Sequence, residues 1–369
     1  MPEQTEYDLP AIASMFQLGG ELLDASPYGS GHINDTFASK VRTAEGERRF
    51  VHQRINHNVF KEPEKVMENI QRVTSHMKAK VAQAGGDPLR EVLTLVPALD
   101  GAAYCQDADG NYWRTYLFIE GARTYDIAED PDHLYKASKA FGRFQRMLSD
   151  LPGGRLHETI PDFHNTRWRF EQFTQAIADD PANRAAEAKN EIDFILTRAE
   201  QAPVFVELAE IGKVPERIVH NDTKFNNVMI DDATGQAICV VDLDTVMPGL
   251  PMYDFGDSVR TGAAAAAEDE KDLSKVRMET DKFDRLAAGY LEEARQFLLP
   301  IEIDNLAFSA RLITYEQAMR FLADHIAGDI YYKIHRPGHN LDRARTQIEM
   351  IRDMESKTAE MEAAIARYR

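Results

Sequence analysis

The sequence predicts an α+β protein with two lobes, in which a small antiparallel β-sheet lobe precedes a large, mainly helical lobe. Three observations predict this architecture. The chain has 369 residues, about twice the ~100–200 residues of one domain. Its first third alternates strand-like runs with turns, and most of the remainder has the apolar period of α-helices. We expect the first lobe at residues 1–119, a hinge at 120–125 and the second lobe at 126–369.

The first lobe is predicted to be one antiparallel sheet with a helix packed on it. Runs that are rich in β-branched, aromatic or alternating residues and bounded by Gly, Asp and Asn predict strands. They lie at residues 36–41, 49–55, 91–98 and 112–119. Behind Pro63, apolar residues recur at helical spacing, namely Val66, Ile70, Val73 and Met77. Because proline suits the first turn of a helix, this segment predicts the packed helix.

The second lobe is predicted to be helical, with a short strand-like insertion. An apolar stripe begins after residues 130–131, an Asp-Pro pair that is typical of a helix start. Similar periods predict helical segments over 187–207 and 306–326. Strand-like pieces interrupt the helices at 228–230 and 237–243.

Composition narrows the class of partners. The chain has 43 Lys and Arg against 61 Asp and Glu, a formal net charge of −18, which repels the phosphates of nucleic acids and anionic lipids. We therefore expect no nucleic-acid and no membrane partner. The two cysteines, Cys105 and Cys239, suit a reducing compartment, and no run approaches the ~20 apolar residues of a membrane span. With the acidic N-terminus, these features predict a cytoplasmic protein, which we expect to be a monomer.

The segment IVHNDTKFNN, residues 218–227, carries the sharpest chemical signal. The carboxylate of Asp222 can accept a hydroxyl proton, and the carboxamide of Asn227 can offer its oxygen to Mg²⁺. Asp242, which follows the apolar run ICVV, predicts a second Mg²⁺ ligand. Each residue alone is typical of an Asn/Asp-rich turn, but the ordered set favours a phosphoryl-transfer site. We interpret His220 as a buried residue that braces this loop.

The order of these features is similar to that of a known superfamily. A glycine turn, a strand-rich lobe, a connector, HNDTKFNN and VVDLD resemble the aminoglycoside phosphotransferase and choline kinase superfamily, relatives of protein kinases. Within it, the chain resembles kinases that use ATP to phosphorylate the anomeric hydroxyl of N-acetylglucosamine and N-acetylgalactosamine. The segments that carry this resemblance are PYGSGHIN, HNDTKFNN, DLDTVMPG, YDFGDSVR, EDEKDLSKV and MRFLADHIAGDIYY. The resemblance implies a two-lobed, protein-kinase-like fold and spans residues 27–332.

The resemblance also implies roles for individual residues at the nucleotide side. Asp222 would be the catalytic base, with Asn227 and Asp242 as the Mg²⁺ ligands. The residues that would bind ATP are Gly29, Ser30 and Gly31 over the phosphates, Gln53 near them, and Phe118, Ile119 and Glu120 at the adenine. Glycine suits a phosphate cover because no Cβ keeps the backbone amides away from the phosphate oxygens.

Other implied roles lie at the acceptor side and behind the catalytic loop. The residues that would contact the sugar are His32, Asn34, Asp222, Arg320 and Tyr331. A solvated helix face for the arginine and a core position for the tyrosine are the alternatives. The DFG triplet at 254–256 copies a protein-kinase metal motif but follows Asp242. We therefore expect Asp254 to begin a helix and to brace the catalytic loop through backbone amides.

One departure from protein kinases concerns the lysine of the third strand, which holds the ATP phosphates there. Matching that strand to FVHQ, residues 50–53, places Gln53 at the lysine position. We expect Gln53 to donate to phosphate, held by Asn69, and magnesium to neutralise more of the charge. The missing lysine favours an alternative, a nucleotide-binding regulator without catalysis. A kinase for choline, homoserine or an aminoglycoside is the other alternative.

Overall fold

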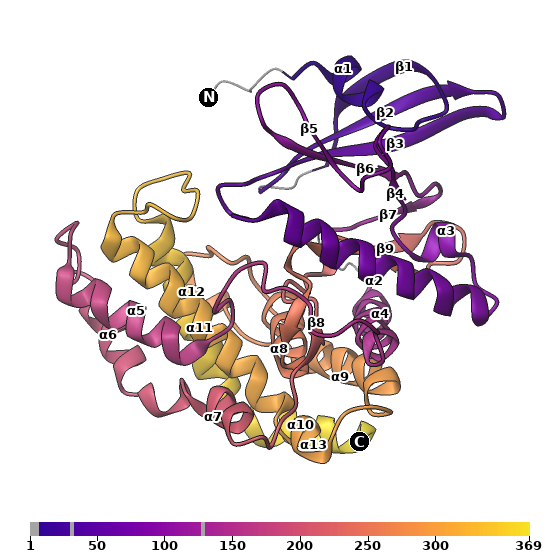
Figure 1. Cartoon of the computed structure of the whole chain (residues 1–369). Coiled ribbons are helices and arrows are strands. Elements are labelled where there is room, and N and C mark those ends of the chain that lie inside the picture. The colour runs from indigo at the N-terminus through magenta and orange to yellow at the C-terminus, as the bar shows by residue number, and fades with distance from the viewer. Residues whose placement is uncertain (1–6, 30–32, 127–129) are drawn as a thin grey trace.

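The computed structural model describes the chain except for residues 1–6, 30–32 and 127–129 (Figure 1). The first part of the described chain forms an antiparallel six-stranded sheet in the order β1-β2-β3-β6-β4, with β5 also paired to β6. Its strands are β1 Gly20–Pro27, β2 Asp35–Thr43, β3 Gly46–Ile55, β4 Leu95–Val96, β5 Cys105–Gln106 and β6 Tyr112–Leu117. This sheet and the helices that follow it confirm the predicted α+β fold.

Several parts of this lobe differ from the sequence prediction. The run at 91–98 is largely not a strand: its first residue ends the short helix α3 Pro88–Glu91, which Asp87 caps by accepting from the Leu89 amide at 3.0 Å, and β4 spans only Leu95–Val96. Strand β1 was not predicted, because its side chains are partly or fully exposed and carry no apolar alternation. The helix α1 Leu9–Ser14, which Asp8 caps, was also missed.

Helix α2 Pro63–Gln83 lies between the sheet and the helical region (Figure 1). The predicted apolar stripe is buried, and it contributes to a cluster that joins α2 to α4 Pro131–Leu148 and to strands β9 Val228–Asp231 and β10 Ala237–Val240. One apolar face of α2 is buried against both lobes, and this burial holds the sheet to the helices. The proline-led start of α2 and the Asp-Pro start of α4 are confirmed.

The remaining helices form the larger lobe around a second apolar cluster. They are α5 Thr166–Asp179, α6 Lys189–Leu196, α7 Val204–Glu210, α8 Pro251–Gly262, α9 Thr280–Ala294, α10 Pro300–Asp304, α11 Leu306–Ala327, α12 His339–Ser356 and α13 Thr358–Tyr368. Helix α11 is buried along most of its length, because α5, α8 and α12 pack against it. The segment 187–207 contains two α-helices rather than one: α6 ends at Leu196, and α7 begins after Pro203.

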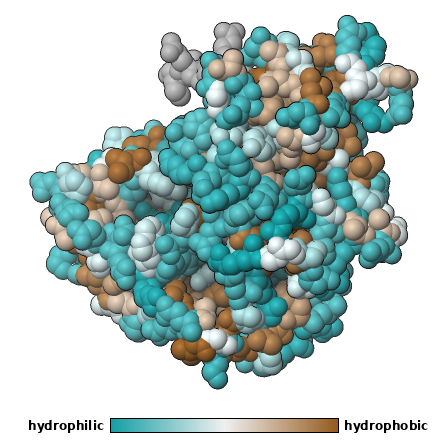
Figure 2. Space-filling model, viewed as in Figure 1, coloured by the Kyte–Doolittle hydropathy of each residue, from teal (hydrophilic) through white to brown (hydrophobic). Residues whose placement is uncertain are grey.

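Short strands position the loops between the lobes. Strands β10, β9 and β7 Ala122–Arg123 form one small sheet, and β11 Met247–Gly249 pairs with β8 Arg217–Val219. The face shown in Figure 2 is mostly hydrophilic, in keeping with the charge of the chain. No helix among the described residues is long and apolar enough to cross a membrane.

Candidate active site

The β9–β10 hairpin brings two of the predicted ligands to one place. In the antiparallel register Val228 pairs with Val240, and the Val241 amide donates to the Asn227 carbonyl at 2.9 Å. Asn227 comes directly before β9, and Asp242 comes directly after this pairing ends. The two side chains that the sequence predicts as Mg²⁺ ligands are therefore neighbours at the same end of one hairpin.

The loop that carries Asp222 is held by carboxylates of α8. Asp254, in the first turn of this helix, accepts from the backbone amides of His220 at 2.8 Å and Asn221 at 2.7 Å. Asp257, one turn on, accepts from the Thr223 amide at 3.0 Å. Burial raises the pKa of Asp254 although these amide donors act to lower it. Asp254 thus braces the loop through backbone amides, as expected, but it does not begin the helix, which starts at Pro251.

His220 fixes the loop from the other side. Its ring is buried, edge-on to Phe141 and Phe144 of α4. The Asp222 amide donates to Nδ1 at 3.3 Å, and Nε2 lies 2.9 Å from the Val241 carbonyl. Because Nδ1 accepts, the ring proton lies on Nε2, which donates to that carbonyl. This histidine links the Asp222 loop to the Asp242 strand without facing solvent.

The carboxylate of Asp222 is partly exposed and has two cationic or amide neighbours. The Asn227 carboxamide nitrogen donates to the Asp222 backbone carbonyl at 2.8 Å and to its Oδ2 at 3.1 Å. The carboxamide oxygen of Asn227 therefore faces away from this acid. The ammonium of Lys224 lies 3.0 Å from Asp222 Oδ1; burial acts to lower the pKa of Lys224, but the charge of Asp222 raises it overall.

Asp242 is exposed to solvent on one side. Protein atoms surround the rest of its carboxylate. This surrounding protein, together with the negative charges of Asp244 and Asp222, raises the pKa of Asp242 to about 6. Its backbone has a left-handed φ of 59°, as does that of Asn221 at 66°. Asp and Asn tolerate this conformation better than other residues with a Cβ, and such positions gather at functional sites.

These groups fit Mg²⁺ better than a metal that needs a full protein cage. Crowded carboxylates with a raised pKa favour a bound cation. Mg²⁺ takes one or two protein oxygens and completes its shell with water and substrate phosphates. The Asp242 carboxylate and the Asn227 carboxamide oxygen would provide these two. Within the described part of the chain, no group of three or more His, Cys, Asp and Glu side chains could hold a metal ion.

The connector expected to receive adenine is held by two arginines of the first lobe. The Phe118 amide donates to the Arg49 carbonyl at 3.1 Å, and the Arg49 guanidinium lies 3.7 Å from the centre of the Phe118 ring. Arg49 also binds the Glu120 carboxylate, while the Glu120 carbonyl accepts from Arg90 at 2.7 Å. Ile119 is buried. A carbonyl oxygen has two lone pairs, so one at Glu120 is left for a ligand.

The phosphate side of the nucleotide site is only partly described. Gly29 follows β1 with a left-handed φ of 80°, which glycine adopts without steric cost. Ser30, Gly31 and His32 lie outside the described residues. Asn34 donates to Asp244 at 2.6 Å and accepts from the Asn56 amide at 3.0 Å, so both ends of its carboxamide are engaged with protein.

The expectation that Asn69 holds Gln53 is wrong. Asn69 faces the larger lobe, where its carboxamide donates to the carbonyls of His157 at 2.8 Å and Val246 at 3.1 Å. Gln53 instead donates to the Thr36 hydroxyl at 3.1 Å, and its carbonyl oxygen accepts from Arg114 Nε at 3.0 Å. Asn69 lies on the face of α2 that packs against the larger lobe, so it does not reach the strand.

Arg320 is connected to the catalytic loop through two buried side chains. His164 lies 3.2 Å from the Asn221 carbonyl through Nε2 and 3.0 Å from Glu316 through Nδ1. The Arg320 guanidinium lies 3.8 Å from the same Glu316 oxygen. Burial acts to lower the pKa of Arg320, but neighbouring tyrosines and Glu316 raise it overall. The Arg320 side chain is 13% exposed, so this arginine does not lie on a solvated face of α11.

The surroundings of Arg320 are aromatic and contain a second arginine. Its guanidinium lies 5.4 Å from the Phe163 ring centre and 5.7 Å from that of Tyr332. Tyr331 is 62% exposed, and Asp324 holds its segment by accepting from the Tyr331 amide at 2.8 Å. Arg169 donates to the Phe163 carbonyl at 3.0 Å; burial, followed by the charge of Arg320, lowers the pKa of Arg169.

Sequence reasoning missed four charged residues around this site: Arg114, Arg169, Lys224 and Asp244. Two had a local signal, because Lys224 lies inside the HNDTKFNN segment and Asp244 lies two residues beyond Asp242. Arg114 also had a signal, since a charged residue in the middle of an aromatic strand needs a partner once buried. Arg169 had none that distinguishes it from other helix arginines.

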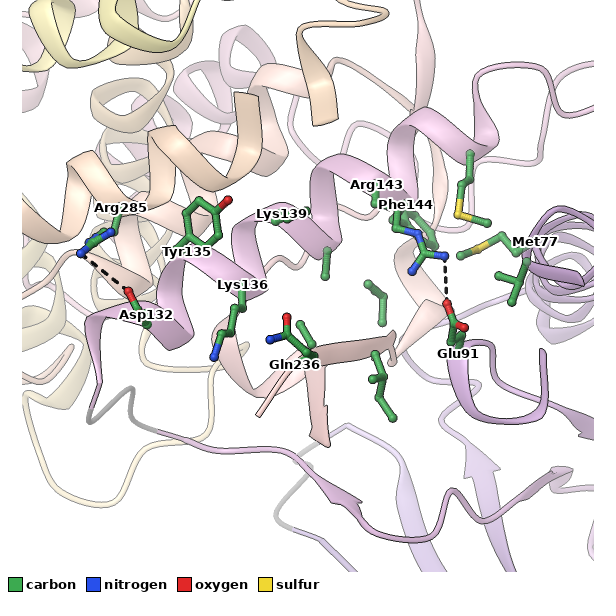
Figure 3. A pocket seen from close by; sticks show the side chains of 16 residues that line it. Met77, Glu91, Asp132, Tyr135, Lys136, Lys139, Arg143, Phe144, Gln236 and Arg285 are labelled. Atoms are coloured by element: carbon green, nitrogen blue, oxygen red, sulfur yellow. Dashed lines mark hydrogen bonds and ion pairs between the residues drawn. The ribbon is translucent and has the colours of Figure 1, made fainter. Parts of the chain in front are cut away.

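A cavity of about 520 Å³ lies elsewhere, between α2, α4, α9 and the β9–β10 hairpin (Figure 3). Figure 3 shows Arg143 paired with Glu91 and Arg285 with Asp132 at its walls. Neither Asp222 nor Asn227 nor Asp242 lines it. The convergence of acid, amide and backbone strain at the hairpin end, rather than this cavity, marks the candidate active site.

Comparison with known proteins agrees with this assignment of the fold. A family model described as the phosphotransferase enzyme family (APH) matches residues 24–299. An aminoglycoside phosphotransferase from Alicyclobacillus acidocaldarius is similar at 13% identity and a TM-score of 0.59, over 99% of this chain and 98% of that one. A spectinomycin phosphotransferase, solved with ADP and spectinomycin, has 12% identity and a TM-score of 0.57, over 97% and 100%. A microcompartment-associated aminopropanol kinase has 15% identity and a TM-score of 0.53, over 96% and 97%.

Proposed function

Because the chain belongs to the phosphotransferase enzyme family, we propose that it is an ATP-dependent N-acetylhexosamine 1-kinase. It would transfer the γ-phosphoryl group of ATP to the anomeric hydroxyl of N-acetylglucosamine or N-acetylgalactosamine. The observation that carries the phosphotransferase part is the meeting of Asp222, Asn227 and Asp242 at one end of the β9–β10 hairpin. Free thiols at Cys105 and Cys239 agree with action in the cytoplasm.

In this proposal, transfer is direct and in line. Asp222 orients the acceptor hydroxyl and accepts its proton, a role for which its partly exposed carboxylate is available. Asn227 and Asp242 would hold Mg²⁺, which neutralises charge on the ATP phosphates when bound. Lys224 lies beside Asp222 and adds positive charge where the transferred group arrives. An anomeric hydroxyl is more acidic than an ordinary alcohol, so a carboxylate base suffices.

The acceptor proposal rests on the charge around Arg320. Choline, aminopropanol and aminoglycosides carry amines or quaternary ammonium groups, which are cationic at neutral pH. The buried guanidinium of Arg320, with Arg169 nearby, would repel such acceptors. A neutral sugar avoids this repulsion, because its hydroxyl and acetamide oxygens can accept from guanidinium donors. The exposed ring of Tyr331 could stack on the pyranose face.

A coupled assay of ADP release tests the acceptor class. We would compare N-acetylglucosamine, N-acetylgalactosamine, choline, homoserine and kanamycin at equal concentrations with Mg²⁺ and ATP. Turnover confined to the two N-acetylhexosamines supports the proposal. Turnover confined to choline, homoserine or kanamycin contradicts the acceptor assignment and retains the kinase. Turnover with none, while ADP still binds, supports a regulator without catalysis.

A further inference from the structure

The carboxylate of Asp244 joins the sheet to the segment that carries Asp242. One of its oxygens is paired with the Arg114 guanidinium from β6. The other accepts from the Asn34 carboxamide at 2.6 Å. Both members of the ion pair are buried, with side-chain exposures of 1% and 3%. Through these two partners, Asp244 anchors the segment that carries Asp242 to β6 and to Asn34, the residue before β2.

Arg114 continues this connection across the sheet. Gln53 of β3 and Arg114 of β6 are opposite each other in the antiparallel register, so their side chains share one face. Arg114 Nε donates to the Gln53 oxygen at 3.0 Å, and the Gln53 amide donates to Thr36 of β2 at 3.1 Å. A chain of polar contacts therefore runs from β2 to Asp244. It places one buried positive charge beside Gln53, the position that is a lysine in protein kinases.

We propose that Arg114 is a positioning residue that takes the place of the missing strand lysine. Through Asp244 it fixes the segment that bears Asp242 against the sheet. Through the same carboxylate, Asn34 fixes the end of the glycine turn. The Asp244 carboxylate thus joins Asn34, by a hydrogen bond, and Arg114, by an ion pair, to the segment that bears Asp242. This inference rests on the proposed function, because it concerns the placement of Mg²⁺ and ATP.

A purely structural role for the ion pair is the competing explanation. A buried ion pair adds little net stability, because the cost of desolvation offsets the attraction. Replacing both partners with apolar residues therefore removes the contact without leaving an unpaired buried charge. The variant Arg114→Met/Asp244→Leu is suited to this test. Its control is Arg198→Met/Glu355→Leu, which removes an ion pair between the end of α6 and α12.

The first readout is the effect of Mg²⁺ on ADP binding, measured by calorimetry with and without the ion. The wild type and the control variant should bind ADP more tightly with Mg²⁺. The Arg114→Met/Asp244→Leu variant should lose this enhancement while keeping its affinity for ADP in the absence of Mg²⁺. A folded variant with the wild-type enhancement would overturn the inference.

The second readout is turnover with the acceptor found in the coupled assay. Misplacement of catalytic groups by about 1 Å can cost ~100-fold in rate, so kcat should fall by about that factor. The KM of the acceptor should change little, because the ion pair lies on the nucleotide side. Retention of more than a tenth of kcat by the folded double variant would contradict the positioning role.

A conservative variant keeps the test open if the double variant does not fold. Arg114→Lys retains a positive charge beside Asp244 but lacks the second guanidinium N–H donor, which binds Gln53. It should keep more of the Mg²⁺ enhancement than Arg114→Met, and equal losses in the two would overturn the inference. Failure of the proposed function has a different signature. The wild type would then phosphorylate none of the acceptors, while ADP binding would still separate the two double variants.

Discussion

At the scale of single residues, Asp222 is the proposed base, and its neighbours define what it can do. Asn227 and Lys224 both contact its side chain, and the amides of its loop are held by Asp254, Asp257 and His220. The acid is therefore fixed in position while one side remains open to an acceptor. A substitution of Asp222 should therefore lower turnover, whereas a substitution of a residue that only holds the loop should mainly lower stability.

Replacing Asp222 with Asn should remove the proton acceptor and preserve the shape. Turnover should drop by the ~100–10,000-fold that is typical of a lost general base. ADP affinity should change little, because the acid faces the acceptor rather than adenine. Steady-state kinetics and calorimetry would measure the two effects. Retention of more than a tenth of the wild-type turnover would refute the role of Asp222 as base.

Asp242 should make stability depend on pH when Mg²⁺ is absent. Its pKa is raised from 3.8 to about 6 in the folded chain, so the protonated form favours folding. Its contribution is present below about pH 4 and is lost as the pH rises through about 6. The melting temperature of the wild type relative to Asp242→Asn should therefore fall over this range. Parallel profiles for the two proteins would contradict this assignment.

The two aspartates at 242 and 254 should respond differently to substitution. Asp242→Asn should raise the Mg²⁺ concentration that half-maximal turnover requires, because a full negative charge leaves the metal site. Asp254→Asn should mainly lower the melting temperature, because Asp254 accepts from two loop amides. Titration of turnover with Mg²⁺ compares them. A changed Mg²⁺ requirement in Asp254→Asn alone would show that the metal ligand was assigned to the wrong aspartate.

Arg320 provides the test of the acceptor side. Arg320→Met removes the guanidinium donors and leaves an apolar chain among Phe163 and Tyr332, so part of the packing is retained. The KM of the sugar should rise far more than the KM of ATP. Kinetic constants measured with each substrate varied in turn would show this. An equal rise for both substrates would mean that Arg320 has a structural role.

At the scale of secondary-structure elements, α8 is the support on which the catalytic loop depends. A Cβ added at Gly256 would lie 2.6 Å from the Ser309 carbonyl oxygen of α11, closer than packed atoms allow. Gly256→Ala should push α8 away from α11, destabilise the fold by about 1–3 kcal/mol and lower kcat with it. Gly262→Ala is the control in the same helix, because its Cβ would meet leucine side chains at 3.2 Å or more. Similar thermal shifts in both variants would contradict this view of α8.

Elements with strong local signals were predictable from the sequence, and those without them were not. Helices α2, α4 and α11 have apolar stripes, and α2 and α4 also have proline-led starts. The side chains of strand β1 are partly or fully exposed, and β4 has two residues. Neither strand therefore shows the alternation of apolar and polar residues from which a strand is predicted. The break between α6, which ends at Leu196, and α7, which begins at Val204, is not visible in the helical apolar period of this segment.

The candidate site divides in the same way. Asp222, Asn227 and Asp242 could be placed together because one loop and one hairpin carry them. Arg114 and Asp244 are separated by 130 residues, so their meeting depends on how the sheet sits on the larger lobe. The roles of Ser30, Gly31 and His32 stay predictions, since these residues lie outside the described chain.

At the scale of the whole molecule, the described residues that are proposed to act on ATP lie where the two lobes meet. The sheet contributes the glycine turn and Arg114, the connector follows at 118–120, and the larger lobe contributes Asp222, Asn227 and Asp242. Arg320 lies on the larger lobe alone, joined to the loop through His164. A substitution at Arg320 should therefore change the use of the acceptor without changing the binding of ATP.

The position that receives phosphate tests the proposed reaction most directly. Phosphorus NMR of the product formed from N-acetylglucosamine, Mg²⁺ and ATP should show a sugar 1-phosphate. The 6-deoxy analogue should still be phosphorylated, whereas the 1-deoxy analogue should bind without giving product. A 6-phosphate, or phosphorylation of the 1-deoxy analogue, would contradict transfer to the anomeric hydroxyl.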